Sequence, residues 1–320
     1  MRKRNLDAEG VQSLYRELLG REVESDAVLQ DHLKGHRTPE SLRLSIMQSE
    51  EYLAKNPRVD LWRFLSGNIA RRGPRIDVEV SPEQLTRLFE RIAGQWSALG
   101  ASDPHWSVLT NDKFRKANFA ENEEEFFRSG QHVAALVQAF AERNNAVIPR
   151  GHMLEFGCGT GRITSALAGT FETVTAVDVS SGHLALCQEA LLRRGVANVS
   201  CLQLDSLQAL ASLPTCSFLL STIVLQHNPP PLIAYLLDWL LSKVEPGGAA
   251  LFQIPTHTPG YEFDVNKYLA SPAPKDFEMH CIPMHHIFAL LHRHGFAPRE
   301  VIMDTWTGMP GSHTFLATKS

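Results

Sequence analysis

Three glycines at alternate positions follow a short apolar segment near the middle of the chain. Gly157, Gly159 and Gly161 come directly after the segment HMLEF at 152–156, and a helix-like run follows them. Glycine weakens the interior of a strand or a helix, so we interpret its use here as positional. A buried strand, a tight glycine turn and a helix start together form a place where a ligand can approach the backbone closely.

Apolar runs alternate with helical segments from residue 152 to the end of the chain. The runs lie at 152–156, 173–178, 198–204, 217–223 and 248–254, and the helical segments at about 161–168, 182–194, 230–243 and 284–294. This alternation predicts βαβ units, and therefore an α/β fold with a Rossmann-like, doubly wound sheet of seven strands. The last two strands, PREVIMDTW and HTFLATK, have no helix between them, so we expect an antiparallel hairpin at the edge of the sheet.

The first part of the chain predicts a small all-α domain at residues 1–55. VQSLYRELLG and DAVLQDHLKG have apolar residues at helical spacing and end at Gly20 and Gly35. A third segment begins with Thr38 as N-cap and Pro39 in the first turn, so we expect three short helices. Residues 56–130 are expected to form a linker, a helix at 82–99 and a polar stretch at 103–130. The α/β domain is expected at 131–320.

Composition and charge argue against several classes of function. The net charge of −4 gives no electrostatic footprint for nucleic-acid binding, and no apolar run approaches the ~20 residues of a membrane helix. The basic start MRKR is not followed by an apolar segment, so we expect no secretory signal. Five cysteines without a CxxC pair favour free thiols in a reducing cytoplasm, and we expect no metal site.

Acidic residues follow the first three strands of this pattern. Asp178 stands at the end of ETVTAVD, where a carboxylate can accept hydrogen bonds from both ribose hydroxyls. Dinucleotide enzymes and methyltransferases share this arrangement. The glycine spacing favours methyltransferases, because Arg162 stands where a nicotinamide-binding loop has its third glycine. Glu155 lies inside the first strand, where a buried acid needs a bonding partner.

Five ordered segments carry a resemblance to a known family. EFGCGTG, AVDVS, LQLDSLQ, SFLLSTIVLQHNPPP and VEPGG occur in the order and at the spacing of class I S-adenosylmethionine-dependent methyltransferases, which residues 152–318 therefore resemble. The resemblance implies S-adenosylmethionine as cofactor. It implies that the residues binding it are Glu155, Gly157, Cys158, Gly159, Gly161, Asp178, Val179, Asp205, Ser206, Leu225 and Gln226.

The same resemblance assigns a role to most of these positions. The glycines would border the methionine moiety, and Asp178 would bind the ribose. Asp205, with the backbone around Ser206, would face the adenine amine, although an acid there also suits a helix N-cap. Leu225 and Gln226 would lie beside the sulfonium. Cys158 is interpreted as a small loop residue and not as a nucleophile.

The N-terminal segment carries a second resemblance. LYRELLGRE and the final SEEY resemble a small helical domain of unknown function that accompanies enzymes of carbohydrate and cell-surface biosynthesis, although VESDA replaces the usual acidic-proline element. The resemblance implies a carbohydrate context and a protein or glycan contact through this domain.

His227 is the best candidate for a catalytic base. It follows the fourth strand, at the sheet edge where ligands bind in such folds, and imidazole titrates near neutrality. A role in supporting the cofactor or capping the next helix stays open. The long loop after the fifth strand offers His257, Tyr261 and His280 as substrate contacts. The stretch at 103–130 is a second lid candidate, with Trp106, Phe126, Phe127 and Arg128, or else it packs against the sheet.

These observations favour a cytoplasmic enzyme that methylates a hydroxyl of a small molecule, sugar or glycan. The alternatives are an N-methyltransferase of a small metabolite or peptide, a nicotinamide oxidoreductase, and a non-catalytic cofactor-binding scaffold. The glycine spacing and the terminal hairpin argue against the oxidoreductase.

Overall fold

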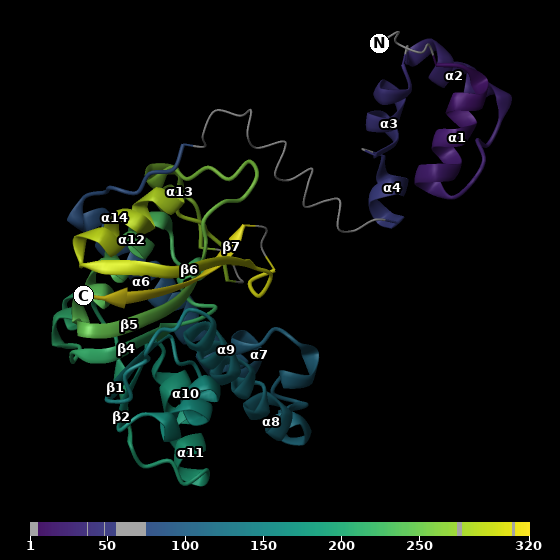
Figure 1. Cartoon of the computed structure of the whole chain (residues 1–320). Coiled ribbons are helices and arrows are strands. Elements are labelled where there is room, and N and C mark those ends of the chain that lie inside the picture. The colour runs from purple at the N-terminus through teal and green to yellow at the C-terminus, as the bar shows by residue number, and fades with distance from the viewer. Residues whose placement is uncertain (1–5, 37, 48, 56–74, 274–276, 309–310) are drawn as a thin grey trace. The chain divides into compact units, whose positions relative to one another are not determined.

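The computed structural model describes residues 6–36, 38–47, 49–55, 75–273, 277–308 and 311–320. The chain divides into two compact units, residues 1–73 and 74–320 (Figure 1). Residues 56–74 of the predicted linker lie outside the described residues.

The first unit consists of helices packed around their own small core. Its helices are α1 (Ala8–Leu19), α2 (Asp26–Gly35), α3 (Pro39–Met47) and α4 (Glu50–Lys55). Val11, Leu14, Leu42 and Ile46 are buried between them. The sequence predicted one helix where the structure has α3 and α4. Ser49 separates the two, because its hydroxyl donates to the Ile46 carbonyl at 2.7 Å and accepts from the next helix, at 3.2 Å from the Tyr52 amide.

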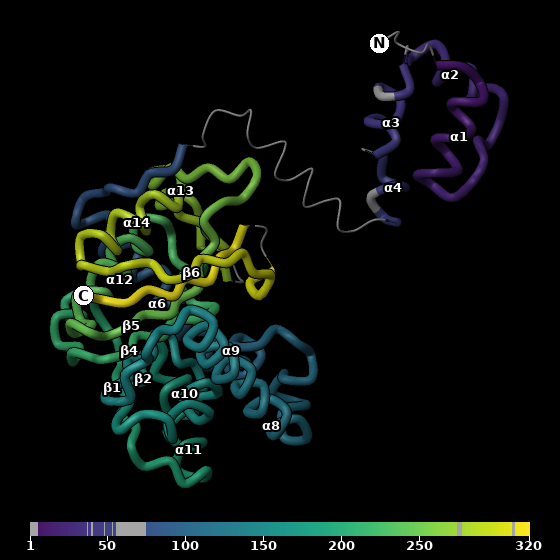
Figure 2. The backbone as a smooth tube through the Cα atoms, in the orientation of Figure 1, coloured from purple at the N-terminus to yellow at the C-terminus, as the bar shows by residue number. Residues whose placement is uncertain are grey.

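The second unit is built on a seven-stranded sheet with the strand order β3-β2-β1-β4-β5-β7-β6. The strands are β1 (His152–Phe156), β2 (Thr173–Asp178), β3 (Val199–Gln203), β4 (Cys216–Ser221), β5 (Val244–Pro255), β6 (Phe296–Asp304) and β7 (Ser312–Lys319). The first five run parallel, and β7 pairs antiparallel with β5 and β6. The predicted fold and its terminal hairpin, the yellow end of the chain in Figure 2, are confirmed.

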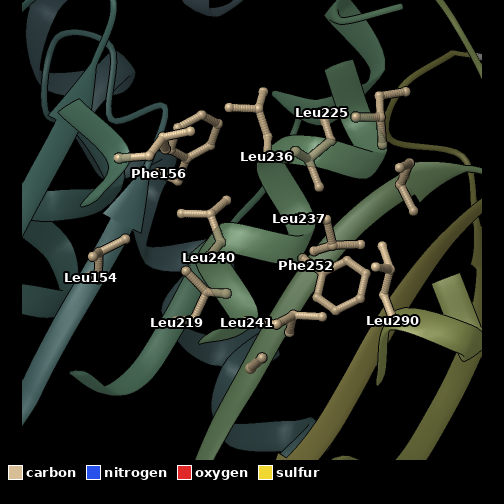
Figure 3. Close-up of a cluster of buried hydrophobic side chains, with 14 of the residues drawn as sticks. Leu154, Phe156, Leu219, Leu225, Leu236, Leu237, Leu240, Leu241, Phe252 and Leu290 are labelled. Carbon is tan, nitrogen blue, oxygen red and sulfur yellow. The ribbon is translucent and has the colours of Figure 1, made fainter. Parts of the chain in front are cut away.

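Helices cover both faces of this sheet. They are α6 (Pro82–Ser102), α7 (Pro104–Val108), α8 (Phe119–Arg128), α9 (Gly130–Arg143), α10 (Arg162–Leu167), α11 (Ser181–Arg193), α12 (Pro230–Lys243), α13 (Val265–Ala270) and α14 (Met284–Arg293). Successive strand residues point to opposite faces. Leu154 and Leu219 therefore pack with Leu237 of α12 and Leu290 of α14 (Figure 3), whereas Met153 and Phe218 pack with α9 and α10.

Two segments are more regular than the sequence predicted. The polar stretch at 103–130 folds into α7, a short 3₁₀ turn and α8, and its Phe126 and Phe127 are buried against Phe114. The lid interpretation of these two phenylalanines is wrong, because they pack in a core of their own. The loop after β5 contains α13. Asp264 caps the N-terminus of this helix, because its carboxylate accepts hydrogen bonds from the amides of Asn266 and Lys267.

Candidate active site

The glycine loop between β1 and α10 has a conformation that its glycines allow. Gly157 and Gly159 have φ angles of 79° and 55°, a region that side chains rarely adopt. A Cβ atom on Gly157 would lie 2.3 Å from Cγ2 of Val224, and one on Gly159 would lie 2.7 Å from Cγ2 of Val108. The alternate glycines therefore satisfy the turn and let two neighbouring walls approach the loop.

Asp178 at the end of β2 is held against this loop. One carboxylate oxygen accepts from the Gly159 amide and the other from the Ser180 amide, both at 2.9 Å. Each oxygen keeps a further lone pair, because a carboxylate has about four acceptor sites. Asp178 also lines the cavity described below, so it can accept hydrogen bonds from a ligand's hydroxyl groups.

The carboxyl group of Glu155 and the guanidinium of Arg162 are both buried, one on each side of the glycine loop. Glu155 is only 2% exposed, and burial raises its pKa to about 7, although it accepts a 2.7 Å hydrogen bond from the Thr164 hydroxyl. Burial lowers the pKa of Arg162 to about 10. The Arg162 guanidinium donates to the Ser129 hydroxyl, whereas its buried Nε atom has no partner among the described residues. Arg162 lines the cavity, so it can hold an anionic group such as a carboxylate there.

A cavity of about 370 Å³ lies along the carboxyl ends of the parallel strands. Its walls come from α6, α7, the glycine loop, the ends of β2 and β4, the loop after β5 and the turn after β6. Ligands of doubly wound sheets bind at this edge. A volume of this size lies at the lower end of the range for small-molecule sites.

His227 lines the same cavity as Asp178 and Arg162. Its Nδ1 atom lies 2.9 Å from the backbone carbonyl of Glu278, which accepts only, so Nδ1 carries the proton and Nε2 carries the lone pair. The Nε2 atom of Gln226 lies 3.4 Å from the Nε2 atom of His227. Burial lowers the pKa of His227 to about 4, below the neutral range expected from the sequence. The imidazole is therefore neutral at pH 7 and can accept a proton.

Two aromatic rings from distant parts of the chain flank His227. The ring centroids of Trp96 on α6 and Phe277 in the loop after β5 lie 5.0 Å and 5.2 Å from that of the imidazole. Both side chains line the cavity. The sequence analysis missed them, because a tryptophan on an amphipathic helix and a phenylalanine in a polar loop carry no motif.

The loop that carries Phe277 and Glu278 is anchored to α6 by one arginine. The Arg91 guanidinium donates to the backbone carbonyls of Tyr268, Ser271 and Pro272 at 3.1, 2.8 and 3.0 Å. It also lies over the Tyr268 ring, 4.2 Å from the centroid. Arg91 thus connects the helix that supplies Trp96 to the loop that orients His227.

Backbone strain is present in the same wall. Ile223, directly after β4, has a φ of 58°, which is uncommon for a β-branched residue. Its amide donates to the buried Gln253 side chain at 3.2 Å, and it lines the cavity. Strained residues of this kind persist where the surrounding structure holds them, often at functional sites.

The structure brings together part of the set named from the sequence. The cavity is lined by Gly157, Cys158, Gly159, Asp178, Val179, Gln226 and His227. The other residues of the set, which do not line it, are Glu155, Gly161, Asp205, Ser206, Leu225, Trp106, His257, Tyr261 and His280. Asp205 is exposed and accepts from the Ser206 hydroxyl at 3.0 Å.

The four substrate candidates from the sequence lie behind the cavity wall or away from it. The Tyr261 hydroxyl and His280 Nδ1 are 2.7 Å apart and bond to each other, and His280 is buried. Trp106 contacts Phe277, with 6.0 Å between their ring centroids, and Arg115 lies over its other side. None of the four lines this cavity, and their contact with a substrate stays a prediction.

His183 on α11 is a further residue that the sequence analysis missed. Its Nε2 atom lies 2.9 Å from the Ser107 hydroxyl of α7, and its Nδ1 atom lies 4.0 Å from a carboxylate oxygen of Asp178. Burial lowers its pKa, so the ring is neutral beside the cavity. His183 therefore fixes α7 against the side of the cavity that contains Asp178.

Residues 153–248 match the family model of a methyltransferase domain. This segment holds the glycine loop, Asp178 and His227.

This segment of the chain is similar to methyltransferase domains. The match agrees with the class expected from the glycine loop and supports S-adenosylmethionine as the methyl donor. It does not extend to the N-terminal helices.

Individual proteins resemble this chain over parts of their length. An uncharacterised protein of Synechococcus sp. (strain PCC 6301), syc1184_c, is 37% identical over 113 residues, which are 34% of this chain and 27% of that protein. The chain thus spans about a quarter of the length of that relative.

Solved structures resemble the chain at low identity. A magnesium protoporphyrin IX methyltransferase from Synechocystis PCC 6803, with bound S-adenosylhomocysteine, is 19% identical with a TM-score of 0.45, covering 67% of this chain and 99% of that one. An S-adenosylmethionine-dependent methyltransferase from Clostridium acetobutylicum is 12% identical with a TM-score of 0.45, covering 64% and 98%. The activity in each name belongs to that protein.

Two negative findings apply to the described part of the chain. No helix there is both long and apolar enough to cross a bilayer. The residues described also contain no group of three or more His, Cys, Asp and Glu side chains arranged to hold a metal ion.

Proposed function

We propose that this protein is an S-adenosylmethionine-dependent methyltransferase that methylates a hydroxyl group of a small molecule, a sugar or a glycan. The observation that carries the proposal is that a neutral imidazole of fixed tautomer, His227, lines the same cavity as the glycine loop and Asp178. One end of the cavity can bind the donor, and the other holds a group that accepts a proton.

The residues of the chain divide the work between these ends. The donor supplies a methyl group on a positively charged sulfur. Asp178 accepts hydrogen bonds from its ribose, and Arg162 binds its carboxylate through the unpaired Nε donor. His227 receives the proton of the acceptor hydroxyl on Nε2, while the Glu278 carbonyl keeps the ring oriented through Nδ1. Alignment of the two reactants supplies the rest of the rate increase.

The N-terminal unit is assigned a supporting role. We propose that its helices contact a glycan or a protein and that the enzyme works in the cytoplasm, as the resemblance of LYRELLGRE and the free thiols suggest. A carbohydrate acceptor rests on this resemblance alone.

Two measurements test the proposal. Calorimetry should detect binding of S-adenosylhomocysteine and none of NADH. Labelled S-adenosylmethionine, incubated with separate panels of phenols, nucleotide sugars, glycans and amines, should give a labelled ether by mass spectrometry. Binding of NADH without binding of S-adenosylhomocysteine would refute the proposed methyltransferase. Labelled amines without a labelled ether would indicate N-methylation in place of O-methylation. Binding of the donor without methyl transfer to any member of the panels would indicate a non-catalytic scaffold.

A further inference from the structure

The charged side chains of the cavity gather at one end. Arg162 and Asp178 are the only formally charged side chains in its lining at pH 7 among the described residues, because burial keeps His183 and His227 neutral. Asp178 lies against the Gly159 amide, and Arg162 begins α10, so both stand at the glycine loop. A charged acceptor such as a nucleotide sugar would find no opposite charge around His227, and burying it there would be costly.

Aromatic rings form the wall around His227. The plane of Phe277 is inclined at 71° to that of His227, and the plane of Trp96 at 59°. Edges and faces of different rings therefore meet in one corner, and Met279 and Trp306 also line the cavity. Such a corner favours a flat π system, because aromatic rings prefer edge-to-face and offset contacts.

The amide nitrogens nearest His227 have partners within the protein, whereas the oxygen of the Gln226 amide and the hydroxyl of Thr222 are buried without one among the described residues. Nδ2 of Asn228 donates to the carbonyls of Val224 and Leu225 at 3.2 and 3.4 Å. Nε2 of Gln226 lies against the imidazole. A sugar presents several hydroxyls that need hydrogen-bond partners once they leave water. An acceptor with a single hydroxyl on an apolar ring needs fewer partners than a sugar, and His227 with these two oxygens can supply them.

From this placement we propose that the acceptor is a phenol, an uncharged aromatic ring that stacks in the corner of Trp96 and Phe277 and presents its hydroxyl to His227. The inference rests on the proposed function and narrows its acceptor class. The phenolic oxygen forms a bond to the methyl carbon while the carbon–sulfur bond breaks, and that electron pair stays on sulfur, which becomes a neutral thioether. The phenolic proton passes to Nε2 of His227, and the resulting imidazolium releases it to water.

The reaction chemistry agrees with the geometry. A phenol has a pKa near ~10, as in the tyrosine side chain, so it is more acidic than the hydroxyl of an aliphatic alcohol. The burial that lowers the pKa of His227 to about 4 also makes it a weak base. Proton transfer to such a weak base is less uphill from a phenol than from an aliphatic alcohol, because the phenol is the stronger acid.

The test compares acceptors of matched size on the full chain. 1-Naphthol and its saturated analogue decahydro-1-naphthol are assayed with labelled S-adenosylmethionine beside a nucleotide sugar, UDP-glucose. We expect kcat/KM for 1-naphthol to exceed that for the saturated alcohol at least ~10-fold, and UDP-glucose to give no product. Calorimetry of 1-naphthol against protein saturated with S-adenosylhomocysteine should show binding.

Variants of the corner provide the second part of the test. Trp96→Leu should raise KM for 1-naphthol about 10-fold with a smaller change in kcat, and Trp96→Phe should restore most of the loss. Trp239→Leu is the matched control, because Trp239 does not line the cavity, and its KM should stay near that of the parent. Phe277→Leu replaces the Trp96 pair if Trp96→Leu does not fold.

Failure of this inference is distinguishable from failure of the proposed function. Loss of S-adenosylhomocysteine binding would refute the proposed function as a whole. Donor binding without 1-naphthol binding, equal transfer to the saturated alcohol, or transfer to UDP-glucose in its place would overturn the phenol alone. An unchanged KM in both the Trp96 and the Phe277 variants would do the same.

Discussion

The two ends of the cavity are built in different ways. At the donor end, the Gly159 amide meets the Asp178 carboxylate across 19 positions of the chain, and backbone atoms make most contacts. At the acceptor end, Arg91 meets the Ser271 carbonyl across 180 positions, and side chains from α6, the turn after β4 and the loop after β5 converge. The contact between the glycine loop and Asp178 is therefore local, whereas the acceptor end depends on contacts between distant segments.

Because of this difference, substitutions at the two ends should impair different properties of the protein. A change at the donor end should alter affinity for the donor, and a change at the acceptor end should alter turnover without it. The variants and conditions below test whether the separation holds.

The largest effect is expected from His227→Ala. Removing the proton acceptor should lower turnover ~10²–10⁴-fold at saturating donor, the usual contribution of a positioned general base. Affinity for S-adenosylhomocysteine should change little. A turnover close to that of the parent would show that His227 is not the base. A loss of affinity for S-adenosylhomocysteine in parallel with turnover would show that the two ends do not act separately.

The converse result is expected from Asp178→Ala. Hydrogen bonds to a charged acceptor contribute about 1.5–3 kcal/mol, so calorimetry should find S-adenosylhomocysteine binding weakened by roughly 10–100-fold. KM for the acceptor at saturating donor should stay close to that of the parent. An unchanged affinity for S-adenosylhomocysteine would show that Asp178 binds only the backbone amides of Gly159 and Ser180 and not the donor.

Acid should destabilise the fold through the buried histidines at the acceptor end. Burial lowers the pKa of His227 to about 4 and that of His280 to about 3, whereas both groups titrate near ~6.5 when unfolded. The unfolded chain then binds more protons between these values, so the free energy of unfolding falls as pH drops from ~6.5 to 4. The loss should be on the order of 2 kcal/mol for His227, measured by denaturant unfolding.

A His227→Gln variant is the control for this pH dependence. Its curve should be flatter over the same range, because the titrating ring is gone. An identical curve would assign the acid sensitivity to the other buried histidines.

A pair of glycine variants isolates the contribution of close approach at the donor end. Gly195 has a φ of 70° with open space around it, whereas a Cβ on Gly157 would collide with Val224. Gly195→Ala should cost ~1 kcal/mol of stability through backbone conformation alone, and Gly157→Ala a further ~1–2 kcal/mol. Equal losses in thermal unfolding would show that the loop tolerates the extra atom.

The smallest effect is expected from deleting residues 1–73. Among the described residues, the hydrophobic clusters of the second unit contain no residue of the first, so the remaining chain should melt cooperatively and bind S-adenosylhomocysteine with parental affinity. The melting temperature should move by no more than a few degrees. Loss of cooperative melting would show that the helical unit contributes to the stability of the second unit.

The sequence predicted the sheet and the donor end because their signals are local. Alternating apolar runs predicted the strands, and Gly157 with Asp178 predicted the loop. The cavity wall of Trp96 and Phe277 could not be predicted, because its members are joined only by folding. His227 was found by its place after β4, whereas its lowered pKa depends on burial that no spacing reveals.

The third N-terminal helix shows the same limit on a smaller scale. Its apolar spacing continues through Ser49, but the hydroxyl of that residue competes for backbone partners and ends one helix and begins another. The spacing of apolar residues does not report such competition.

The anchoring of the loop by Arg91 has a consequence for how the protein is made. Chain synthesis proceeds from the N-terminus, and contacts between distant residues require a long loop to close. β1, the glycine loop and β2 can pair as soon as residue 178 has left the ribosome. The carbonyls that Arg91 binds lie at 268–272, so the aromatic corner is completed only when nearly the whole unit has been made. A chain arrested before that point would contain the glycine loop and Asp178 but would lack the completed aromatic corner around His227.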